Sequence, residues 1–447
     1  MNAIAATTSE AASSDKRGVN ALFRRVLMPL FLLSVCPPFA IVVWHTHTAL
    51  DGSLVRLYQM FAARGALEGL RDIWGPVFFG SPTAWLIIGS FAAFELALMR
   101  FLPGPDFRGP VTPAGNVPVY KQNGPAAFVV TLATFAALSA FGVISPSIVY
   151  DHFGAILGAL NTFALLFCLG LYFKGRFAPS SADASTSGNP IFDYYWGTEL
   201  HPRVLGWDVK MFTNCRFGMM GWAVIIASFA AKQHMSGGLS SGMLVAVGLQ
   251  LFYIAKFFLW ETGYLGSLDI MHDRAGFYIC WGCLVWVPST YTSATLYLVK
   301  HPVELGVWAP LLAAAGVAAI LVNYLADAQR QAVRAADGKT TVWGKPPVLI
   351  RAEYTTQKGE RKESLLLASG YWGIARHFHY VPELLGAFFW TLPVLFDHLL
   401  PWFYPIFLTI LLFDRAFRDD KRCAAKYGPH WAAYCAQVRY KIIPGIL

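Results

Sequence analysis

The stretch LLGAFFWTLPVLFDHLLPWFYPIFLTILL, residues 384–412, decides the fold because nearly all of its side chains are apolar. A helix of about 20 apolar residues crosses the hydrocarbon core of a bilayer, which is about 30 Å thick. The stretch is therefore long enough for two short passes. Pro393, Asp397, His398 and Pro401 interrupt it in the middle. We predict a helical hairpin within a membrane.

The composition of the whole chain supports this interpretation. Of its 447 residues, 56% are hydrophobic and only 14% are charged, unlike an ordinary soluble domain. Eight further apolar runs cover residues 26–44, 77–99, 125–144, 154–173, 217–231, 242–260, 276–299 and 305–326. We therefore predict an all-α integral membrane protein with about ten transmembrane helices.

Basic residues flank the predicted spans in three places. They gather at 16–25 before the first span, at 330–362 after the eighth span and at 415–426 after the hairpin. Because cytoplasmic loops carry an excess of Lys and Arg, both ends of the chain are expected in the cytoplasm. The net charge of +9 then follows from topology, so no nucleic-acid partner is expected.

Two segments are expected to lie outside the membrane. Residues 1–25 are rich in Ala, Ser and Thr and predict a disordered tail, so that residues 26–447 form the membrane domain. The stretch TTVWGKPPVLIRAEYTTQKGERKES, residues 340–364, alternates apolar and polar residues around turn formers. It predicts a small strand hairpin on the cytoplasmic face, between the eighth span and the helical hairpin.

Polar residues form a first cluster directly after the eighth span. Arg330 and Arg334 are four residues apart, so on a continuing helix they point the same way. Two guanidinium groups at a helix end could clamp a phosphate. The alternative is that both residues anchor the span at the membrane interface.

A second cluster lies in SGYWGIARHFHYVPE, residues 369–383. A helix from Ala375 onward would place Arg376, His379, Tyr380 and Glu383 on one stripe. Proline at position 382 is compatible with a helix that begins near Tyr380. Guanidinium, imidazole, phenol and indole groups suit a ligand that carries phosphate, amide and an aromatic ring. The alternative is a structural Arg–Glu pair with an interfacial histidine.

A third cluster lies in DRAFRDDKRCAAKYGPHWAAYC, residues 414–435. Gly428 followed by Pro429 predicts the end of one helix and the start of another. One face of the first helix is expected to carry Asp419, Cys423, Lys426 and Tyr427, and Trp431 and Tyr434 continue on the second helix. A solvated amphipathic face is the alternative, but the aromatic content favours ligand binding.

A fourth group lies between the sixth and seventh spans. Asp269, His272 and Asp273 are expected on one helix face near Glu261. Carboxylates and a histidine could bind a metal ion, but a proton relay or a hydrogen-bonded helix junction is the better interpretation. The nearby C-x-x-C pair at 280–283 lies in an apolar run without a second pair. No metal site is therefore predicted.

Four runs of the sequence resemble the sterol reductases that reduce ring double bonds, and among them the plant-type branch of Δ7-sterol reductases. They are NCRFGMMGW (214–222), DIMHDRAGFYICWGCLVWVPSTYT (269–292), ARHFHYVPE (375–383) and RDDKRCAAKYG (418–428). The resemblance implies an enzyme of the endoplasmic reticulum membrane, or of the inner membrane in a bacterium. Its implied reaction is the NADPH-dependent reduction of the C7–C8 double bond of 5,7-diene sterols, as from 7-dehydrocholesterol to cholesterol.

The resemblance also implies a cytoplasm-facing NADPH pocket, formed mostly by residues 327–447. The implied cofactor-binding residues are Arg330, Arg334, Leu367, Trp372, His379, Tyr380, Asp419, Cys423, Ala424, Ala425, Lys426, Tyr427 and Tyr434. The sequence has no G-x-G-x-x-G turn, so side chains are expected to hold the dinucleotide. Implied partners are the sterol, membrane lipid and other enzymes of sterol biosynthesis.

Three acids are candidates for the proton donor. Protonation of C8 in a 5,7-diene leaves a cation at C7 that the C5–C6 double bond stabilises, and a hydride then adds at C7. The enzyme must place one acid at C8. Tyr253 is our first hypothesis, with Asp273 and Glu261 as alternatives. Tyr253 and Tyr291 both lie within predicted spans, where packing is the alternative role.

Other function classes stay open on the sequence alone. The first is reduction of the C14–C15 sterol double bond on the same fold. The second is a membrane methyltransferase of the isoprenylcysteine type, against which the ten spans count. The third is a non-catalytic sterol-binding protein, in which the nucleotide residues are expected to be disrupted. Arg334, Trp372, Tyr380, Asp419 and Tyr434 are all present here.

Overall fold

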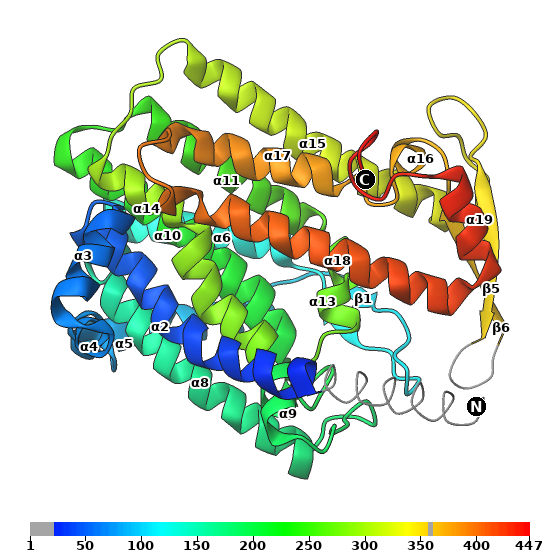
Figure 1. Cartoon of the computed structure of the whole chain (residues 1–447), viewed down its shortest axis with the longest axis horizontal. Helices are drawn as coiled ribbons and strands as arrows, with labels where there is room; N and C mark the ends of the chain where they lie inside the picture. The colour runs from blue at the N-terminus through cyan, green and yellow to red at the C-terminus, as the bar shows by residue number, and fades with distance from the viewer. Residues whose placement is uncertain (1–21, 356–360) are drawn as a thin grey trace, which may run out of the picture. The chain divides into compact units, whose positions relative to one another are not determined.

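The computed structural model describes residues 22–355 and 361–447. Residues 1–21 of the expected tail lie outside the described residues, and the first helix begins at Phe23. The chain divides into two compact units (Figure 1). Unit 1 contains the chain up to Lys232 and residues Phe257–Leu296, whereas unit 2 contains Gln233–Lys256 and Tyr297–Leu447.

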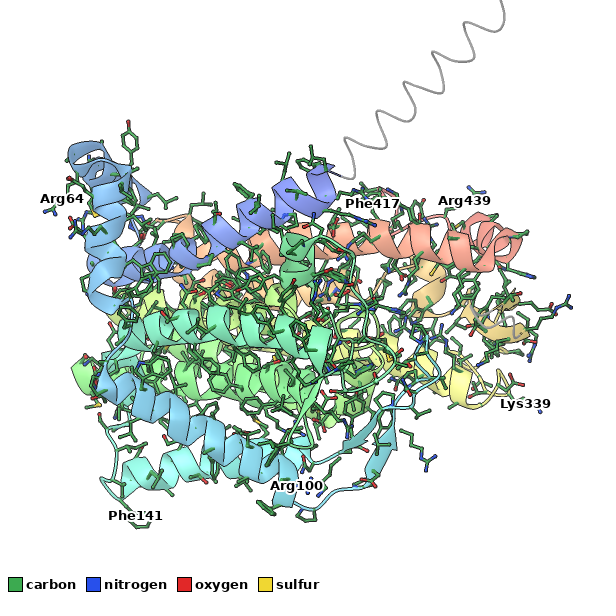
Figure 2. The ribbon with its side chains drawn as sticks, turned by 90° about the horizontal axis from the view of Figure 1, so that it is seen from below. Arg64, Arg100, Phe141, Lys339, Phe417 and Arg439 are labelled. Atoms are coloured by element: carbon green, nitrogen blue, oxygen red, sulfur yellow. The ribbon has the colours of Figure 1, made fainter. Side chains whose placement is uncertain are left out.

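Helices make up most of unit 1. Its main elements are η1 (Phe23–Leu27), α2 (Met28–Ala49), α3 (Leu54–Arg64), α4 (Ala66–Trp74), α5 (Pro82–Phe101), α6 (Gly124–Ala140), α7 (Ile148–Asp151), α8 (Phe153–Phe177), α9 (Pro190–Trp196), η3 (Met211–Met219), α10 (Met220–Gly237), α12 (Glu261–Leu265), α13 (Leu268–Met271), η4 (Phe277–Tyr291) and α14 (Ser293–Lys300). Two short strand pairs, β1 (Asp106–Arg108) with β2 (Val119–Lys121) and β3 (Arg203–Val204) with β4 (Trp207–Asp208), are antiparallel. In Figure 2, α5 and α6 are neighbours between the labelled Arg100 and Phe141.

Unit 2 contains the predicted helical hairpin and the predicted strand hairpin. Its elements are α11 (Ser241–Leu259), α15 (Trp308–Ala335), β5 (Leu349–Thr355), β6 (Arg361–Leu367), α16 (Tyr371–Ile374), α17 (Tyr380–Thr391), α18 (Phe403–Tyr427) and α19 (Pro429–Gln437). The antiparallel register of β5 and β6 runs from the Leu349–Leu367 pair to the Thr355–Arg361 pair. Figure 1 shows α15 and α17 side by side.

The membrane prediction is confirmed, although some spans are shorter than expected. Within the described residues, seven helices are long and apolar enough to cross a membrane: Phe23–Ala49, Pro82–Phe101, Phe153–Phe177, Met211–Gly237, Ser241–Leu259, Trp308–Ala335 and Leu400–Tyr427. The apolar helix Gly124–Ala140 is shorter. The run at 276–299 divides at Thr292 into η4, which contains Pro288, and α14.

Helix α17 begins at Tyr380 and not at Ala375, so the expected stripe from Arg376 to Glu383 is wrong. Residues 375–379 form turns instead. The helix break before Pro429 is confirmed, because α18 ends at Tyr427 and Gly428 has a positive φ of 49°. Glycine adopts this left-handed conformation without the steric cost of a Cβ atom.

A buried ion pair joins three segments of unit 1. Arg216 of η3 and Glu261 at the start of α12 have fully buried side chains, and Nη1 donates to Oε1 at 2.5 Å. Arg216 Nη2 also donates to Asn123 Oδ1 at 2.8 Å, while Glu261 Oε2 accepts from the Gly124 N–H at 3.0 Å. Both Glu261 oxygens are thus engaged at the start of α6.

Loss of this pair should destabilise the fold. Glu261→Gln leaves the buried Arg216 guanidinium without a counter-charge, and breaking a buried pair in this way costs about 3 kcal/mol or more. The measurement is the free energy of unfolding in mixed detergent micelles. Asp414→Asn is the control, because Asp414 and Arg418 form an exposed i,i+4 pair. Equal stability of the two variants would contradict this role.

Candidate functional site

Arg330 lies against an aromatic ring in unit 2. Its guanidinium carbon is 4.0 Å from the centroid of the Trp372 ring, which is a favourable cation–π distance. Nη2 donates to Asp327 Oδ1 at 3.0 Å, and about a third of the side chain (31%) is exposed. Arg334, one turn later, donates from Nε to the Leu365 carbonyl of β6 at 3.4 Å. Arg330 and Arg334 both lie on α15, so they belong to one continuous helix, as expected for the first cluster.

Trp372 connects the first and third clusters. Its Nε1 donates to the Ala326 carbonyl at 2.7 Å, and its own carbonyl accepts from the Tyr434 hydroxyl at 3.3 Å. The ring packs with Leu367 and Val333 in a small buried group. Tyr434, 62 residues after Trp372 in the sequence, therefore lies together with Trp372 and its neighbour Leu367, as expected.

Arg376 has a structural role that the sequence did not reveal. Its Nη1 donates to the carbonyls of Val438 and Arg439 at 2.7 and 3.0 Å. The backbone N–H groups of Arg376 and His377 donate to the carbonyls of Tyr440 and Lys441. This pairing with the C-terminal segment, rather than a helix, holds the turn that carries the histidines.

Sequence reasoning missed His377, which the turn places among the predicted cofactor residues. Its ring stacks on Tyr380, with centroids 5.4 Å apart and an interplanar angle of 9°. Nε2 lies 3.9 Å from Asp419 Oδ2 of α18. The histidine is the second residue of the run RHFHY, residues 376–380. Its place in this polar run was the signal in the sequence that could have identified it.

His379 has a buried nitrogen that no protein group satisfies. Its ring centroid is 4.9 Å from that of Trp372 and 4.3 Å from that of Tyr380. Nδ1 is buried and has no hydrogen-bond partner within residues 22–355 and 361–447. A buried unsatisfied nitrogen is costly, so it favours a ligand that supplies the partner.

The residues of α18 contact the strand hairpin. Asp419 accepts from Arg422 at 2.6 Å and from Cys423 Sγ at 3.7 Å. Lys426 Nζ lies 4.0 Å from the centroid of the Tyr354 ring. Tyr427 donates to Ser364 Oγ at 3.4 Å. The two adjacent alanines, Ala424 and Ala425, are exposed on the same helix.

Burial keeps the two histidines neutral. It lowers the pKa of His377 to about 4, with the nearby Asp419 charge opposing the shift. Burial likewise lowers the pKa of His379 to about 3. The imidazoles can therefore donate and accept hydrogen bonds without charge.

This set of side chains fits a nicotinamide dinucleotide. Arg330 offers a partly exposed cation of the kind that binds phosphate. The rings of Trp372 and Tyr380 pack on His379, whose unpartnered Nδ1 can pair with an amide or hydroxyl. These side chains thus match the charge, the aromatic surface and the polar edge of a dinucleotide, although the sequence has no Gly-rich turn.

Tyr253 lies in unit 2 and is hydrogen-bonded to a carboxylate. Its hydroxyl donates to Glu383 Oε1 at 2.5 Å, and its ring packs against Trp390. Lys256 Nζ, 5.1 Å from the ring centroid, donates to Asn323 Oδ1, and Asn323 Nδ2 donates to the His379 carbonyl at 2.9 Å. Polar contacts therefore link α11 through α15 to the histidine turn.

The other two acid candidates lie in unit 1. Glu261 is held by Arg216, as described above. Asp273 lies beyond α13, which ends at Met271, so the expected helix face shared by Asp269, His272 and Asp273 is wrong. The Asp273 carbonyl accepts from the buried Lys210 Nζ at 2.6 Å. Within the described parts of the chain, no group of three or more His, Cys, Asp or Glu residues could hold a metal ion.

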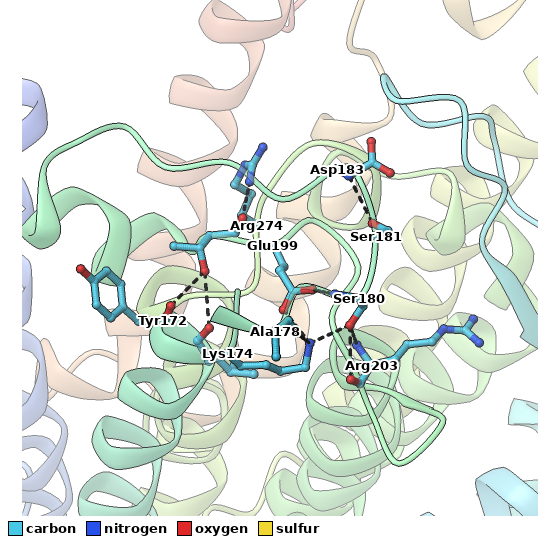
Figure 3. A network of polar contacts seen from close by, with 11 residues as sticks. Tyr172, Lys174, Ala178, Ser180, Ser181, Asp183, Glu199, Arg203 and Arg274 are labelled. Carbon is cyan, nitrogen blue, oxygen red and sulfur yellow. Dashed lines mark hydrogen bonds and ion pairs between the residues drawn. The ribbon is translucent and has the colours of Figure 1, made fainter. Parts of the chain in front are cut away.

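The stretch Glu199-Leu-His201-Pro-Arg203 anchors a loop in unit 1 (Figure 3). Glu199 accepts from Lys174 Nζ at 2.7 Å and from the Ser180 N–H at 2.6 Å. Ser180 Oγ accepts from the Arg203 N–H at 2.8 Å. His201 lies 3.2 Å from the Tyr120 hydroxyl. These contacts are structural and keep the segment before β3 folded.

Fold and side chains together define a multi-pass helical membrane protein whose C-terminal unit carries a cluster of cationic, aromatic and imidazole side chains. The sequence model of the Ergosterol biosynthesis ERG4/ERG24 family matches residues 32–447, and the chain belongs to this family. It is an oxidoreductase that reduces a sterol double bond. The family generally uses a nicotinamide cofactor.

Three relatives illustrate the similarity. The chain is 55% identical to 7-dehydrocholesterol reductase of Arabidopsis thaliana over 93% of its own length and 96% of the relative's. It is 36% identical to Delta(14)-sterol reductase of Methylotuvimicrobium alcaliphilum over 98% and 100% of the two lengths. It is 37% identical to 7-dehydrocholesterol reductase of Xenopus laevis over 84% and 83%.

The two neutral histidines predict acid sensitivity. The unfolded chain protonates His377 near pH 6.5, whereas the folded chain does so near pH 4. Between these values the unfolded state binds more protons, so stability is full above pH 6.5 and falls as the pH falls toward 4. His377→Gln should reduce the loss of unfolding free energy between pH 6.5 and pH 4 by at most about 3 kcal/mol.

The measurement is the free energy of unfolding between pH 7 and 4. His234→Gln is the control, because His234 is exposed on α10. His379 also has a lowered pKa, so part of the decrease should persist in the variant. A His377→Gln profile identical to that of the parent would show that His377 is not buried in its neutral form.

Proposed function

We propose that the chain catalyses the NADPH-dependent reduction of the C7–C8 double bond of 5,7-diene sterols. The 55% identity to the Arabidopsis protein named 7-dehydrocholesterol reductase carries this proposal. A second candidate is reduction of the C14–C15 double bond, which the 36% identity to a Delta(14)-sterol reductase supports. The endoplasmic reticulum membrane is the proposed location, and other enzymes of sterol biosynthesis are proposed partners.

The proposed cofactor residues are those of the three clusters in unit 2. Arg330 and Arg334 hold phosphate groups, Trp372 and Tyr380 provide ring faces, and His379 pairs with a polar edge. When bound, NADPH supplies the hydride that the alkene carbon receives. The side chains orient the dinucleotide and exclude water from it.

Tyr253 is the proposed proton donor. Its phenol is a neutral acid whose hydroxyl oxygen is positioned by Glu383, to which it donates in this structure, and the O–H group must turn from Glu383 to the sterol to act. The reaction breaks the O–H bond of Tyr253 and forms a C–H bond at C8 of the sterol, while the hydride forms the C–H bond at C7. Glu383 is the proposed route by which the phenolate regains a proton from solvent.

The alternatives Asp273 and Glu261 are less favoured. Glu261 is paired with Arg216 and accepts the Gly124 N–H, so both oxygens are engaged as acceptors. Asp273 is buried beside Lys210, which its backbone carbonyl binds. Tyr253 differs from both because its donor atom already carries the proton to be transferred.

Tyr253→Phe should reduce turnover about 100-fold or more, because general acid catalysis typically contributes at least that factor. Affinity for NADPH should stay within twofold. Turnover is measured as loss of diene absorbance, and affinity by equilibrium binding of NADPH. Tyr291→Phe is the control, because Tyr291 packs on Trp222 within unit 1. Full turnover by Tyr253→Phe would reject the assignment.

Arg330→Ala should weaken NADPH binding about tenfold or more, because a charge-assisted hydrogen bond contributes about 1.5–3 kcal/mol. Arg351→Ala is the matched control. Arg351 is an exposed arginine on β5 that pairs with Glu363. The measurement is titration of the purified protein with NADPH. Equal affinity of both variants would contradict a phosphate contact by Arg330.

Expression in yeast that accumulates 5,7-diene sterols tests the reaction. The diene absorbance should disappear and a C7–C8-saturated sterol should appear. An unchanged diene with reduced C14–C15 sterols would support the second candidate. No change in any sterol, from protein that is folded and inserted, would contradict both proposals.

A further inference from the structure

Unit 1 contains a cavity that the proposed reaction does not use. Its volume is about 390 Å³, and α5, α6, α8, η3, α10 and η4 contribute its walls. Apolar side chains dominate the lining, among them Ile88, Phe91, Leu138, Ile148 and Phe217. A volume of this size lies within the range of about 300–1,000 Å³ that is typical of small-molecule sites.

The cavity is elongated along the helices. Its lining residues on α5 run from Ile87 to Phe94, and those on α6 run from Thr131 to Leu138. Seven residues of an α-helix span about 10 Å. The walls are therefore long enough to line a fused ring system. Ile144 and Ile148 continue the lining beyond the end of α6.

A glycine on α10 leaves part of the cavity open. Gly221 lines the cavity, and a Cβ atom added there would have only Phe91 Cε1 within 4 Å, at 3.7 Å. A larger residue at this position would therefore extend into the cavity without meeting backbone. Gly221 is thus the position at which the cavity can be filled most directly.

One end of the cavity carries a polar pair. Thr131 lines the cavity, and its hydroxyl donates to Glu95 Oε1 at 2.6 Å. Glu95 is 0% exposed, and Oε2 has no hydrogen-bond partner in the part of the chain that the structure describes. The charge of Arg216 also acts on Glu95, but its guanidinium donates to Glu261 and Asn123.

A buried carboxyl group in a membrane helix is costly and usually faces a ligand or a polar cavity. An unsatisfied acceptor adds to this cost. A ligand hydroxyl would remove it, because a hydroxyl group can both donate and accept. It can therefore pair with Glu95 Oε2 in either protonation state of the carboxyl group.

We propose that this cavity binds a sterol, with the sterol hydroxyl at Thr131, whose own hydroxyl is bonded to Glu95, and the alkyl tail near Leu138 and Ile148. A sterol combines a long apolar body with a single terminal hydroxyl, which matches the mostly apolar walls and the buried Thr131–Glu95 pair. A phospholipid acyl chain offers no polar group to Glu95. A fatty acid would bring a second carboxylate against it. The proposal does not depend on which sterol double bond the enzyme reduces.

Photo-labelling of the full-length purified protein tests this assignment. The probe is a 3-hydroxysterol with a diazirine in its alkyl tail, in micelles that contain phosphatidylcholine. Peptide mapping should find the label within residues 138–148, at the end opposite Thr131. Excess unlabelled sterol should reduce this labelling at least tenfold. A sterol without the 3-hydroxyl should compete at least fivefold less well.

Two variants and a control separate a cavity site from surface adsorption. Gly221→Leu fills the cavity and should reduce labelling at 138–148 at least fivefold. Gly89→Leu introduces the same side chain on α5, where Gly89 is exposed with nothing within 4 Å of its Cβ position, and should not reduce labelling. Thr131→Val, which removes a hydroxyl without adding volume, should weaken competition by 3-hydroxysterols about fivefold.

Three results would overturn the proposal. They are undiminished labelling in both Gly221→Leu and Thr131→Val, equal competition by sterols with and without the hydroxyl, and competition by phosphatidylcholine alone. Size-exclusion chromatography establishes that each variant is folded before labelling. Because the readout is labelling and not turnover, failure of the sterol site is distinguishable from failure of the proposed reaction.

Discussion

The structure depends on the cost of an unpaired polar group in hydrocarbon. Each buried charge in the membrane helices must find a partner within the protein. In unit 1 the Arg216–Glu261 pair meets this requirement and at the same time fixes the start of α6. Lys210 meets it with the carbonyls of Ile270 and Asp273. Glu95 meets it only in part, because Oε1 accepts from Thr131 whereas Oε2 has no hydrogen-bond partner within the described residues. This unpaired oxygen points to a ligand.

The same constraint shapes unit 2 in a different way. Here the polar groups lie on a turn, a strand hairpin and helix ends rather than within one helix. Trp372 connects α15 and α19 through two hydrogen bonds, and Arg376 ties the histidine turn to the C-terminal segment. The proposed dinucleotide site can therefore be formed by side chains alone. The Gly-rich turn of other nucleotide-binding folds has no counterpart in this sequence.

Local patterns were sufficient to predict much of this arrangement. Apolar length gave the spans and the helical hairpin, and the Gly428–Pro429 pair gave the break between α18 and α19. Spacing of Arg330 and Arg334 predicted their common helix. The contacts of Trp372 could not be predicted in this way, because its partners lie 46 and 62 residues away in the sequence.

The errors have the same physical origin. Arg376 was placed on a helical stripe because the sequence there has helical spacing, but pairing with Tyr440 and Lys441 replaces the helix. Glu261 stays an untested alternative acid, and its partner Arg216 could not be foreseen because it lies 45 residues away. Asp273 was placed on a helix face, but α13 ends after Met271. Non-local partners decide the role of each residue.

The most direct test of the proposed reaction follows the two hydrogens that the sterol gains. The purified enzyme is supplied with a 5,7-diene sterol and NADPH deuterated at the transferable position, and the product is examined by NMR. The account predicts deuterium at C7 and a solvent-derived proton at C8. Deuterium at C14 or C15, or at C8 with the proton at C7, would contradict it.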